Sequence, residues 1–105
     1  MVDCVTSLGG TDIRFDEWNL DYAYSGTQKC LASPPGLSPV AISDRALEFI
    51  KNRQSQPTSW YLDLACIADY WGKNHIAHQT TPVNLVYALR AVSYTHLTLP
   101  TNREV

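Results

Sequence analysis

The stretch that decides the fold is YSGTQK at residues 24–29, taken together with VDCVTSLGG at residues 2–10. The first contains the short apolar run of residues 2–5, and the second follows the aromatic run of residues 22–24. Both runs continue into glycine-containing sequence, which is typical of a buried strand leading into a turn. Asp3 lies in the first run, and Lys29 closes the second, 26 positions later. Because open α/β sheets bind ligands at the carboxyl ends of their strands, these two side chains predict a site at one sheet edge.

The remaining N-terminal sequence predicts further strands and a loop between them. Residues 22–24 and 39–42 have the short aromatic and apolar character of strands, whereas SPPG at residues 33–36 predicts a rigid loop. Residues 16–20 predict a helical turn capped by Asp16.

Three helices are then predicted, which makes this a piece of an α/β domain. The expected caps are Ser43-Asp44 for the first helix, Thr58-Ser59 for the second and Thr81-Pro82, with proline at the first helical position, for the third. One side of each helix carries its apolar stripe. The stripes comprise Ala46, Phe49 and Ile50, with Arg53 at the edge; Trp60, Leu64, Ile67 and Trp71, ended by Gly72; and Leu85, Val86 and Leu89.

Composition excludes several classes of protein. The 105 residues allow one small domain, and 45% hydrophobic with 17% charged residues are ordinary for a globular protein. A formal net charge of −2 favours neither nucleic acid nor an acidic membrane as a partner. No run reaches the length of a transmembrane helix, and the start does not look like a signal peptide. Three cysteines without C-x-x-C spacing indicate reduced thiols in an intracellular protein.

The last 15 residues, 91–105, are interpreted as a non-native tail. The codons GCT GTC TCT TAT ACA CAT CTG, one native G followed by a common transposon-end sequencing adapter, translate to AVSYTHL, the sequence of residues 91–97. The predicted helical pattern also stops at Ala91. A natural β-prone tail is the alternative, since residues 94–99 alternate polar and apolar side chains.

Asp3 and Lys29 together predict a pyridoxal phosphate (PLP) site. A lysine amine forms a Schiff base with the cofactor aldehyde, and a carboxylate partners the pyridinium nitrogen. Lysine also suits proton transfer at the substrate α-carbon, because its pKa falls readily in a dry site. A single surface lysine or a strand-end aspartate would mean little, so the conjunction with other motifs carries the specificity.

Those motifs are PPG at residues 34–36, WYLD at 60–63, YWG at 70–72 and YALR at 87–90. With them, residues 2–90 resemble the class V aminotransferases, specifically the alanine–glyoxylate and serine–pyruvate group. The resemblance implies that residues 1–90 are a fragment of the large domain of a fold-type I PLP-dependent transferase.

The resemblance also implies roles for individual residues. Val5 matches the apolar residue that packs against the cofactor ring, and Gln28 matches a residue near the cofactor phosphate. Thr80 matches a threonine that reaches the phosphate of the other subunit's cofactor, which implies a homodimer. The family motif tyrosine-histidine-histidine-threonine reads AHQT at residues 77–80, so Ala77 lacks the tyrosine hydroxyl.

The function implied for the parent protein is transfer of an amino group from alanine or serine to the 2-oxo acid glyoxylate or pyruvate. Asp3 and Lys29 would serve 3-hydroxykynurenine transaminase and other class V enzymes equally well. A second hypothesis is a non-catalytic truncated chain, because the family's glycine-rich phosphate segment and substrate-binding arginine have no match here; Arg90 lies on a helix before that region. Relatives occur in cytoplasm, peroxisomes and mitochondria.

Competing interpretations of other residues are weaker. His75 and His78 have helical spacing but lack a third ligand, so no metal site is expected. Cys30 beside Lys29 is interpreted as a small packed residue rather than a nucleophile. The tryptophans of the second helix are expected to pack in the core.

Overall fold

The computed structural model describes residues 1–97 of the chain. Its order is β1 (Val2–Asp3), β2 (Tyr22–Tyr24), β3 (Val40–Ile42), α1 (Asp44–Lys51), α2 (Leu64–Trp71), α3 (Val83–Val92) and a π-helical turn, η1 (Ser93–Leu97). Strands precede three helices, as the sequence predicts. Two compact units are present, one built from residues 1–41 with 81–97 and one from residues 42–80.

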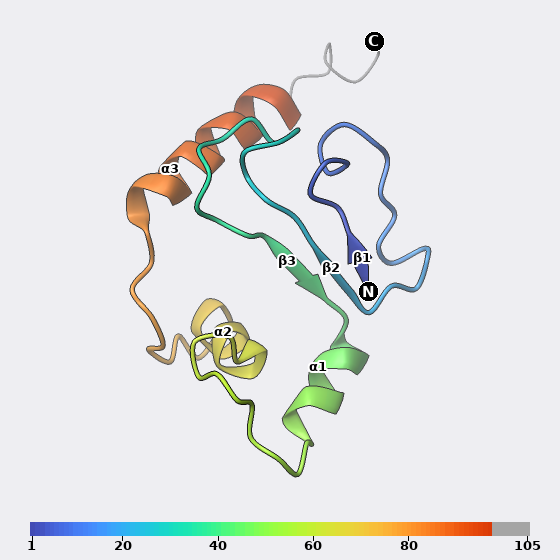
Figure 1. The fold of residues 1–105 in the computed structure, drawn as a ribbon, viewed down its shortest axis with the longest axis vertical. Helices are drawn as coiled ribbons and strands as arrows, with labels where there is room; N and C mark the ends of the chain where they lie inside the picture. Colours follow the sequence, from blue (N-terminus) through green and yellow to red (C-terminus); the bar gives the residue numbers. More distant parts are fainter. Residues whose placement is uncertain (98–105) are drawn as a thin grey trace. The chain divides into compact units, whose positions relative to one another are not determined.

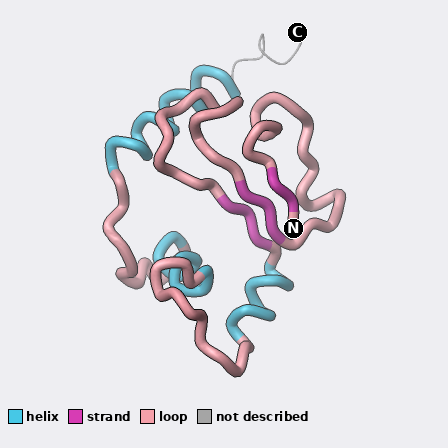
Figure 2. Tube along the Cα trace, viewed as in Figure 1, coloured by secondary structure: helices cyan, strands magenta, loops and turns pink. Residues whose placement is uncertain are grey.

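The sheet of the first unit has the strand order β1-β2-β3 (Figure 1). β1 and β2 are parallel, with Val2 opposite Ala23 and Asp3 opposite Tyr24. Beyond the paired strands, the Ser25 amide donates to the Pro39 carbonyl at 2.9 Å. Long loops follow the short strands (Figure 2), so side chains in these loops form much of the unit's interior.

The buried side chains in the described part of the chain cluster around the ends of β1 and β2. Cys4, Ala23 and Leu31 are the buried apolar residues. Ser25, Thr27 and Ser33 are buried polar residues of the segment that follows β2. The core of the first unit therefore lies at the carboxyl ends of the parallel strands, in the same region of the chain as the predicted site residues Asp3, Val5, Gln28 and Lys29.

The first predicted helix forms, but the stripe assigned to it is too long. Ser43 caps α1 by accepting from the Ala46 amide at 3.0 Å, as expected. The helix ends at Lys51, so Arg53 lies beyond it. α1 contacts α2, and the Lys51 amine lies 3.5 Å from an Asp69 carboxylate oxygen.

The second helix begins later than predicted. Asp63, not Thr58-Ser59, is its N-cap and accepts from the Ala65 amide at 3.0 Å. The Ser59 hydroxyl instead accepts from the Leu62 amide at 3.4 Å, within a separate turn. Trp60 is therefore outside the helix. The expected tryptophan core is wrong for this chain, since Trp60 and Trp71 are 60% and 62% exposed.

Two other local predictions need correction. Residues 15–19 form a turn and not a capped helix, because the Asp16 backbone carbonyl, rather than its side chain, accepts from the Asn19 amide at 3.0 Å. Pro82, predicted as the first helical residue of α3, is instead its N-cap, so the helix begins one position later, at Val83. α3 also runs past Ala91 to Val92, so the helical pattern does not stop where the sequence suggested. Its Leu85 side chain lies against Gly36, whose φ is +133°.

Within residues 1–97, no helix has both the length and the apolar character that crossing a membrane requires.

Candidate functional site

The candidate site is built on the parallel pairing of β1 and β2. Because parallel strands run in the same direction, the segments that follow them leave the sheet at the same edge. The Cys4 amide donates to the Tyr24 carbonyl at 2.8 Å and extends the ladder by one residue. Two further bonds join the following segments: the Ser25 hydroxyl donates to the Cys4 carbonyl at 3.1 Å, and the Cys30 thiol to the Thr6 carbonyl at 2.9 Å.

Asp3, at the end of β1, has both carboxylate oxygens hydrogen-bonded. Oδ1 accepts from the Val5 amide at 2.9 Å, and Oδ2 accepts from the Tyr24 hydroxyl at 3.0 Å. The residue itself is exposed. The hydrogen bond to Asp3 raises the pKa of the Tyr24 phenol, and desolvation of the phenol adds a smaller contribution in the same direction. Tyr24 therefore remains a donor to Asp3 at neutral pH.

The segment before Lys29 is held from inside by Thr27, which is fully buried. The Thr27 hydroxyl donates to the Pro34 carbonyl at 2.6 Å, and its carbonyl accepts from the Ser33 amide at 2.8 Å. These bonds close residues 27–34 into a tight loop. Lys29 lies in that loop, where its own carbonyl accepts from the Ala32 amide at 2.9 Å.

Val5, Gln28 and Lys29 all lie at this edge. A methyl group added to Gly26 would lie 2.9 Å from the Gln28 amide oxygen and 3.6 Å from Val5 Cγ1, so both side chains adjoin Gly26. Lys29 is exposed, and within residues 1–97 its amine has no hydrogen-bond or ion-pair partner. Four of the five predicted residues thus lie at the end of β1 (Asp3) or in the segments that follow β1 and β2 (Val5, Gln28 and Lys29).

Thr80, the fifth predicted residue, belongs to the other unit, residues 42–80, and is exposed. Beside it, the Gln79 side-chain oxygen is buried without a hydrogen-bond partner in the described chain. The His78 ring of the same motif packs against Trp60, with 4.1 Å between ring centroids and the ring planes tilted by 53°. No group of three or more potential metal ligands occurs in the part of the chain that the structure describes.

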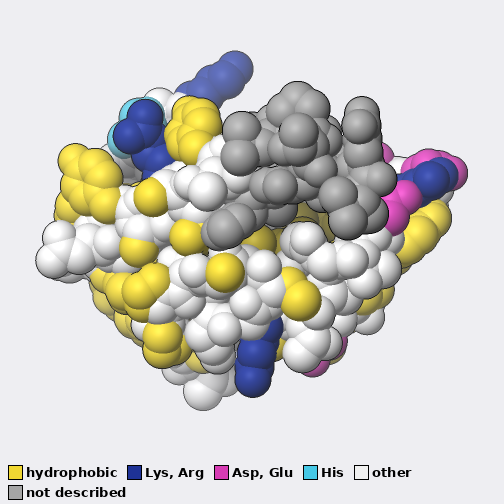
Figure 3. All heavy atoms as spheres, turned by 90° about the horizontal axis from the view of Figure 1, so that it is seen from above, with side chains coloured by type: hydrophobic (Ala, Val, Ile, Leu, Met, Phe, Trp, Pro, Cys, Tyr) yellow, Lys and Arg dark blue, Asp and Glu magenta, His cyan; other side chains and the backbone are white. Residues whose placement is uncertain are grey.

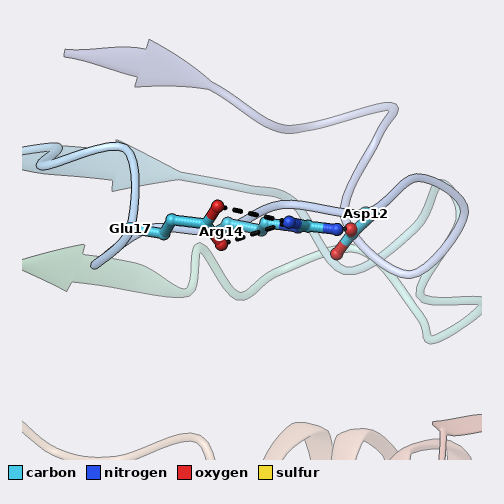
Figure 4. Close-up of polar contacts among 3 residues, drawn as sticks. All are labelled: Asp12, Arg14 and Glu17. Atoms are coloured by element: carbon cyan, nitrogen blue, oxygen red, sulfur yellow. Dashed lines mark hydrogen bonds and ion pairs between the residues drawn. The ribbon is translucent and has the colours of Figure 1, made fainter.

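A cluster of three charged side chains lies on the exposed loop between β1 and β2. Arg14 lies between Asp12 and Glu17, with Nε 2.8 Å from Asp12 Oδ2 and Nη1 3.2 Å from Glu17 Oε2 (Figure 4). Hydrogen bonds to Asp12 and then to Glu17 raise the pKa of the Arg14 guanidinium. All three side chains are more than half exposed, so these ion pairs contribute little to stability.

Sequence reasoning gave no role to Tyr24, although it is the only side chain in residues 1–97 that hydrogen-bonds the Asp3 carboxylate. Its contact depends on the register of two strands separated by 18 residues of chain, residues 4–21. A tyrosine closing the strand that precedes the lysine was the available signal.

Comparison with known proteins gives consistent matches. No protein-family model matches the chain. The alanine–glyoxylate aminotransferases of Drosophila melanogaster and Felis catus are 45% and 47% identical to it, each over 93 aligned residues that cover 86% of this chain. These matches cover 24% and 22% of the two relatives, so the chain spans about a quarter of their length.

Solved structures agree with this result. An alanine–glyoxylate aminotransferase from Nostoc sp. matches with a TM-score of 0.88 and 43% identity, over 96% of this chain and 27% of its own. The ureidoglycine–glyoxylate aminotransferase of Bacillus subtilis matches with a TM-score of 0.89 and 38% identity, over 98% of this chain and 27% of its own. The expected resemblance and the expected fold, a partial α/β domain of this kind, are therefore confirmed.

Proposed function

We propose that this chain, a homologue of about one quarter of a class V aminotransferase, is part of a longer PLP-dependent enzyme that transfers amino groups to glyoxylate. The observation that carries the proposal is the edge where β1 and β2 end. There a hydrogen-bonded carboxylate and an amine without a partner lie on adjoining segments, in a chain whose relatives are named aminotransferases.

The chemistry of these side chains fits the cofactor. PLP needs a primary amine for covalent attachment and a carboxylate beside its ring nitrogen. Lys29 has an exposed amine that nothing in residues 1–97 engages. Asp3 is exposed, and each of its oxygens accepts one recorded hydrogen bond, which leaves acceptor capacity for a third donor.

Lys29 and Asp3 would then have separate tasks. Bound PLP supplies a ring that accepts electrons from the substrate α-carbon. The Lys29 amine would hold the cofactor covalently and would also be the base that takes the proton from that α-carbon. Asp3 keeps a proton on the ring nitrogen, because opposite charges a few ångströms apart favour the charged forms.

Three further residues complete the proposed site. Val5 packs against the cofactor ring, and Gln28 lies near the phosphate; their common position beside Gly26 supports this pairing. Thr80 serves the phosphate of a second subunit's cofactor, so the full-length protein is proposed to be a homodimer. Ala77 supplies no hydroxyl there, which leaves Thr80 as the hydroxyl-bearing residue of that motif.

The substrates follow from the relatives' names. Glyoxylate appears in the names of both the alanine and the ureidoglycine enzymes, so it is the proposed amino acceptor. Alanine is the proposed donor, with serine and pyruvate as further substrates of the same group. The isolated 105-residue chain is proposed to be inactive, because it spans about a quarter of its relatives.

The test is an aminotransfer assay on the full-length protein that contains this chain. With PLP, alanine and glyoxylate should yield pyruvate and glycine, and Lys29→Ala should lower the rate by at least about 10²–10⁴-fold, the usual contribution of a proton-transfer group. Lys73→Ala, which removes an exposed lysine of the other unit, is the matched control and should retain the rate. Full activity of Lys29→Ala, or turnover by the 105-residue chain alone, would contradict the proposal.

A further inference from the structure

The Asp3 carboxylate is oriented by two donors from different parts of the fold. The Val5 amide, two residues along the same segment, binds Oδ1 at 2.9 Å. The Tyr24 hydroxyl, on the neighbouring strand, binds Oδ2 at 3.0 Å. One hydrogen bond would leave the carboxylate free to turn about it, whereas bonds to both oxygens fix its plane.

The contact with Tyr24 is a consequence of strand register. Asp3 and Tyr24 are directly paired in the parallel ladder, so their side chains leave the same face of the sheet. The backbone of Tyr24 is anchored by its carbonyl, which accepts from the Cys4 amide at 2.8 Å. Its neighbours Ala23 and Ser25 are buried. The backbone that carries the Tyr24 phenol is therefore held in place on both sides.

We propose that Tyr24 is a positioning residue that holds the Asp3 carboxylate in the orientation needed to meet the cofactor's ring nitrogen. This inference rests on the proposed function, because it gives Asp3 that role. Tyr24 itself touches neither cofactor nor substrate in this account and acts only through Asp3.

The protonation state of Tyr24 is consistent with this task. Donation to Asp3 raises the pKa of the phenol above its ordinary value of 10.0. The hydrogen bond is therefore complete at neutral pH and is lost only as the pH rises through the raised pKa. The titratable groups that face the phenol across this contact are Asp3, Cys4 and Tyr22.

Tyr22 provides a matched control. It has the same side chain, belongs to the same strand and lies two positions away, with 6.2 Å between its ring centroid and that of Tyr24. In residues 1–97 its hydroxyl has no hydrogen-bond partner. Tyr22→Phe therefore removes a hydroxyl from the same neighbourhood and leaves Asp3 unchanged.

The experiment is a double-mutant cycle on cofactor affinity. Full-length apoprotein is titrated with PLP, and the dissociation constant is measured by absorbance for wild type, Tyr24→Phe, Asp3→Asn and the double variant. Tyr24→Phe should weaken binding by about three- to tenfold, the net effect of one ordinary hydrogen bond. In the Asp3→Asn background the same change should have almost no effect, and Tyr22→Phe should match wild type.

Two results would overturn the inference. Tyr24→Phe could bind the cofactor as tightly as Tyr22→Phe does, or it could weaken binding equally with and without the Asp3 carboxylate. The second result would show that Tyr24 acts on general structure and not through Asp3.

An independent measurement covers the case in which Tyr24→Phe does not fold. Ultraviolet titration of the apoprotein should show one tyrosine with a raised pKa in wild type, and this raised value should disappear in Asp3→Asn. An unchanged tyrosine titration in Asp3→Asn would contradict the contact. Wild-type protein that binds no PLP at all would instead contradict the proposed function, so the two failures are distinguishable.

Discussion

Thr27 shows how one buried hydroxyl can set the position of a reactive neighbour. It lies two residues before Lys29 and is 0% exposed, although threonine is usually found at the surface. Its hydroxyl donates at 2.6 Å to the Pro34 carbonyl, on the far side of the loop that contains the lysine. The bond satisfies the buried Thr27 hydroxyl and gives the Pro34 carbonyl a donor within the protein.

Replacing Thr27 by valine should therefore destabilise this loop. The substitution keeps the shape but removes the hydrogen bond to the Pro34 carbonyl, and losing one such bond costs about 0.5–1.5 kcal/mol in free energy of unfolding. Urea denaturation of the full-length protein measures the change.

Thr6→Val is the control for Thr27→Val. Thr6 is exposed, and its hydroxyl has no hydrogen-bond partner within residues 1–97, so the change should stay within about 0.5 kcal/mol. Equal effects of the two substitutions would show that the Thr27 bond does not hold the loop.

Residue-level features were predictable where they depend on near neighbours. The Ser43 cap was predicted because its acceptor and donor are three residues apart. The Asp3–Tyr24 bond was not predicted, because it spans 21 positions and requires the strand register. The closeness of Val5 and Gln28 at Gly26 was not predicted either, since no local pattern specifies a contact across two loops; family resemblance gave only their separate roles.

At the scale of elements, the start of α2 illustrates competition between two caps. Both Ser59 and Asp63 have side chains that suit an N-cap, and both accept a backbone amide. The helix starts only at Asp63, while Ser59 closes a separate turn. The apolar spacing from Trp60 to Trp71 suggested the longer helix, because periodicity cannot reveal an interruption in the backbone.

Asp63→Ala should shorten α2 and destabilise the unit formed by residues 42–80. The lost cap costs about 0.5–2 kcal/mol, whereas Ser59→Ala should cost less than about 0.5 kcal/mol. Hydrogen exchange of the first α2 amides, read by mass spectrometry, locates the effect. Faster exchange in Ser59→Ala than in Asp63→Ala would support the longer helix that the sequence suggested.

The Cys66 thiol contacts the Asp63 carboxylate, so its pKa is sensitive to that side chain. Its hydrogen bond to Asp63 Oδ2, at 3.3 Å, is the main cause that raises the pKa of Cys66 above its ordinary value of 9.0, and desolvation of the thiol adds to this. A raised pKa means that this contribution to stability is present below pH 9.0 and is lost as the pH rises through the folded-state pKa. Asp63→Ala should therefore lower the Cys66 pKa, and its alkylation rate near pH 8 should rise.

At the scale of the whole molecule, the described helices are only partly covered. None of α1, α2 and α3 contains a buried residue. Hydrophobic side chains reach the surface in the view of Figure 3, and Phe49, Leu62 and Trp71 are 75%, 67% and 62% exposed. Large exposed apolar areas indicate surfaces that pack against something else. We propose that the remaining parts of the full-length protein cover them.

This proposal predicts a difference in tryptophan fluorescence. The three tryptophans are 53%, 60% and 62% exposed in this chain, so iodide should quench their emission strongly. In the full-length protein the same tryptophans should be shielded, with a quenching constant at least about twofold lower. Single-tryptophan variants that retain Trp60 or Trp71 assign the signal, and equal quenching in chain and full-length protein would contradict the proposal.

The tail also belongs to this scale. The sequence alignments cover 86% of the chain, which leaves a share about the size of residues 91–105, whereas the structural alignments extend over 96–98%. A helical backbone continues through residues 93–97, so helix continuity cannot mark the boundary. We propose that the natural part of this chain ends at Arg90 and that residues 91–105 are not native. Sequencing the source gene beyond the Arg90 codon tests this, because the gene should continue with a different sequence.

The most direct test of the central claim is to map the lysine that carries the cofactor. Full-length protein is loaded with PLP, reduced with borohydride to make the link permanent, and digested for peptide mass spectrometry. We predict the added cofactor mass on the peptide that contains Lys29. Cofactor on a different lysine, or no covalent cofactor in a folded protein, would contradict the account.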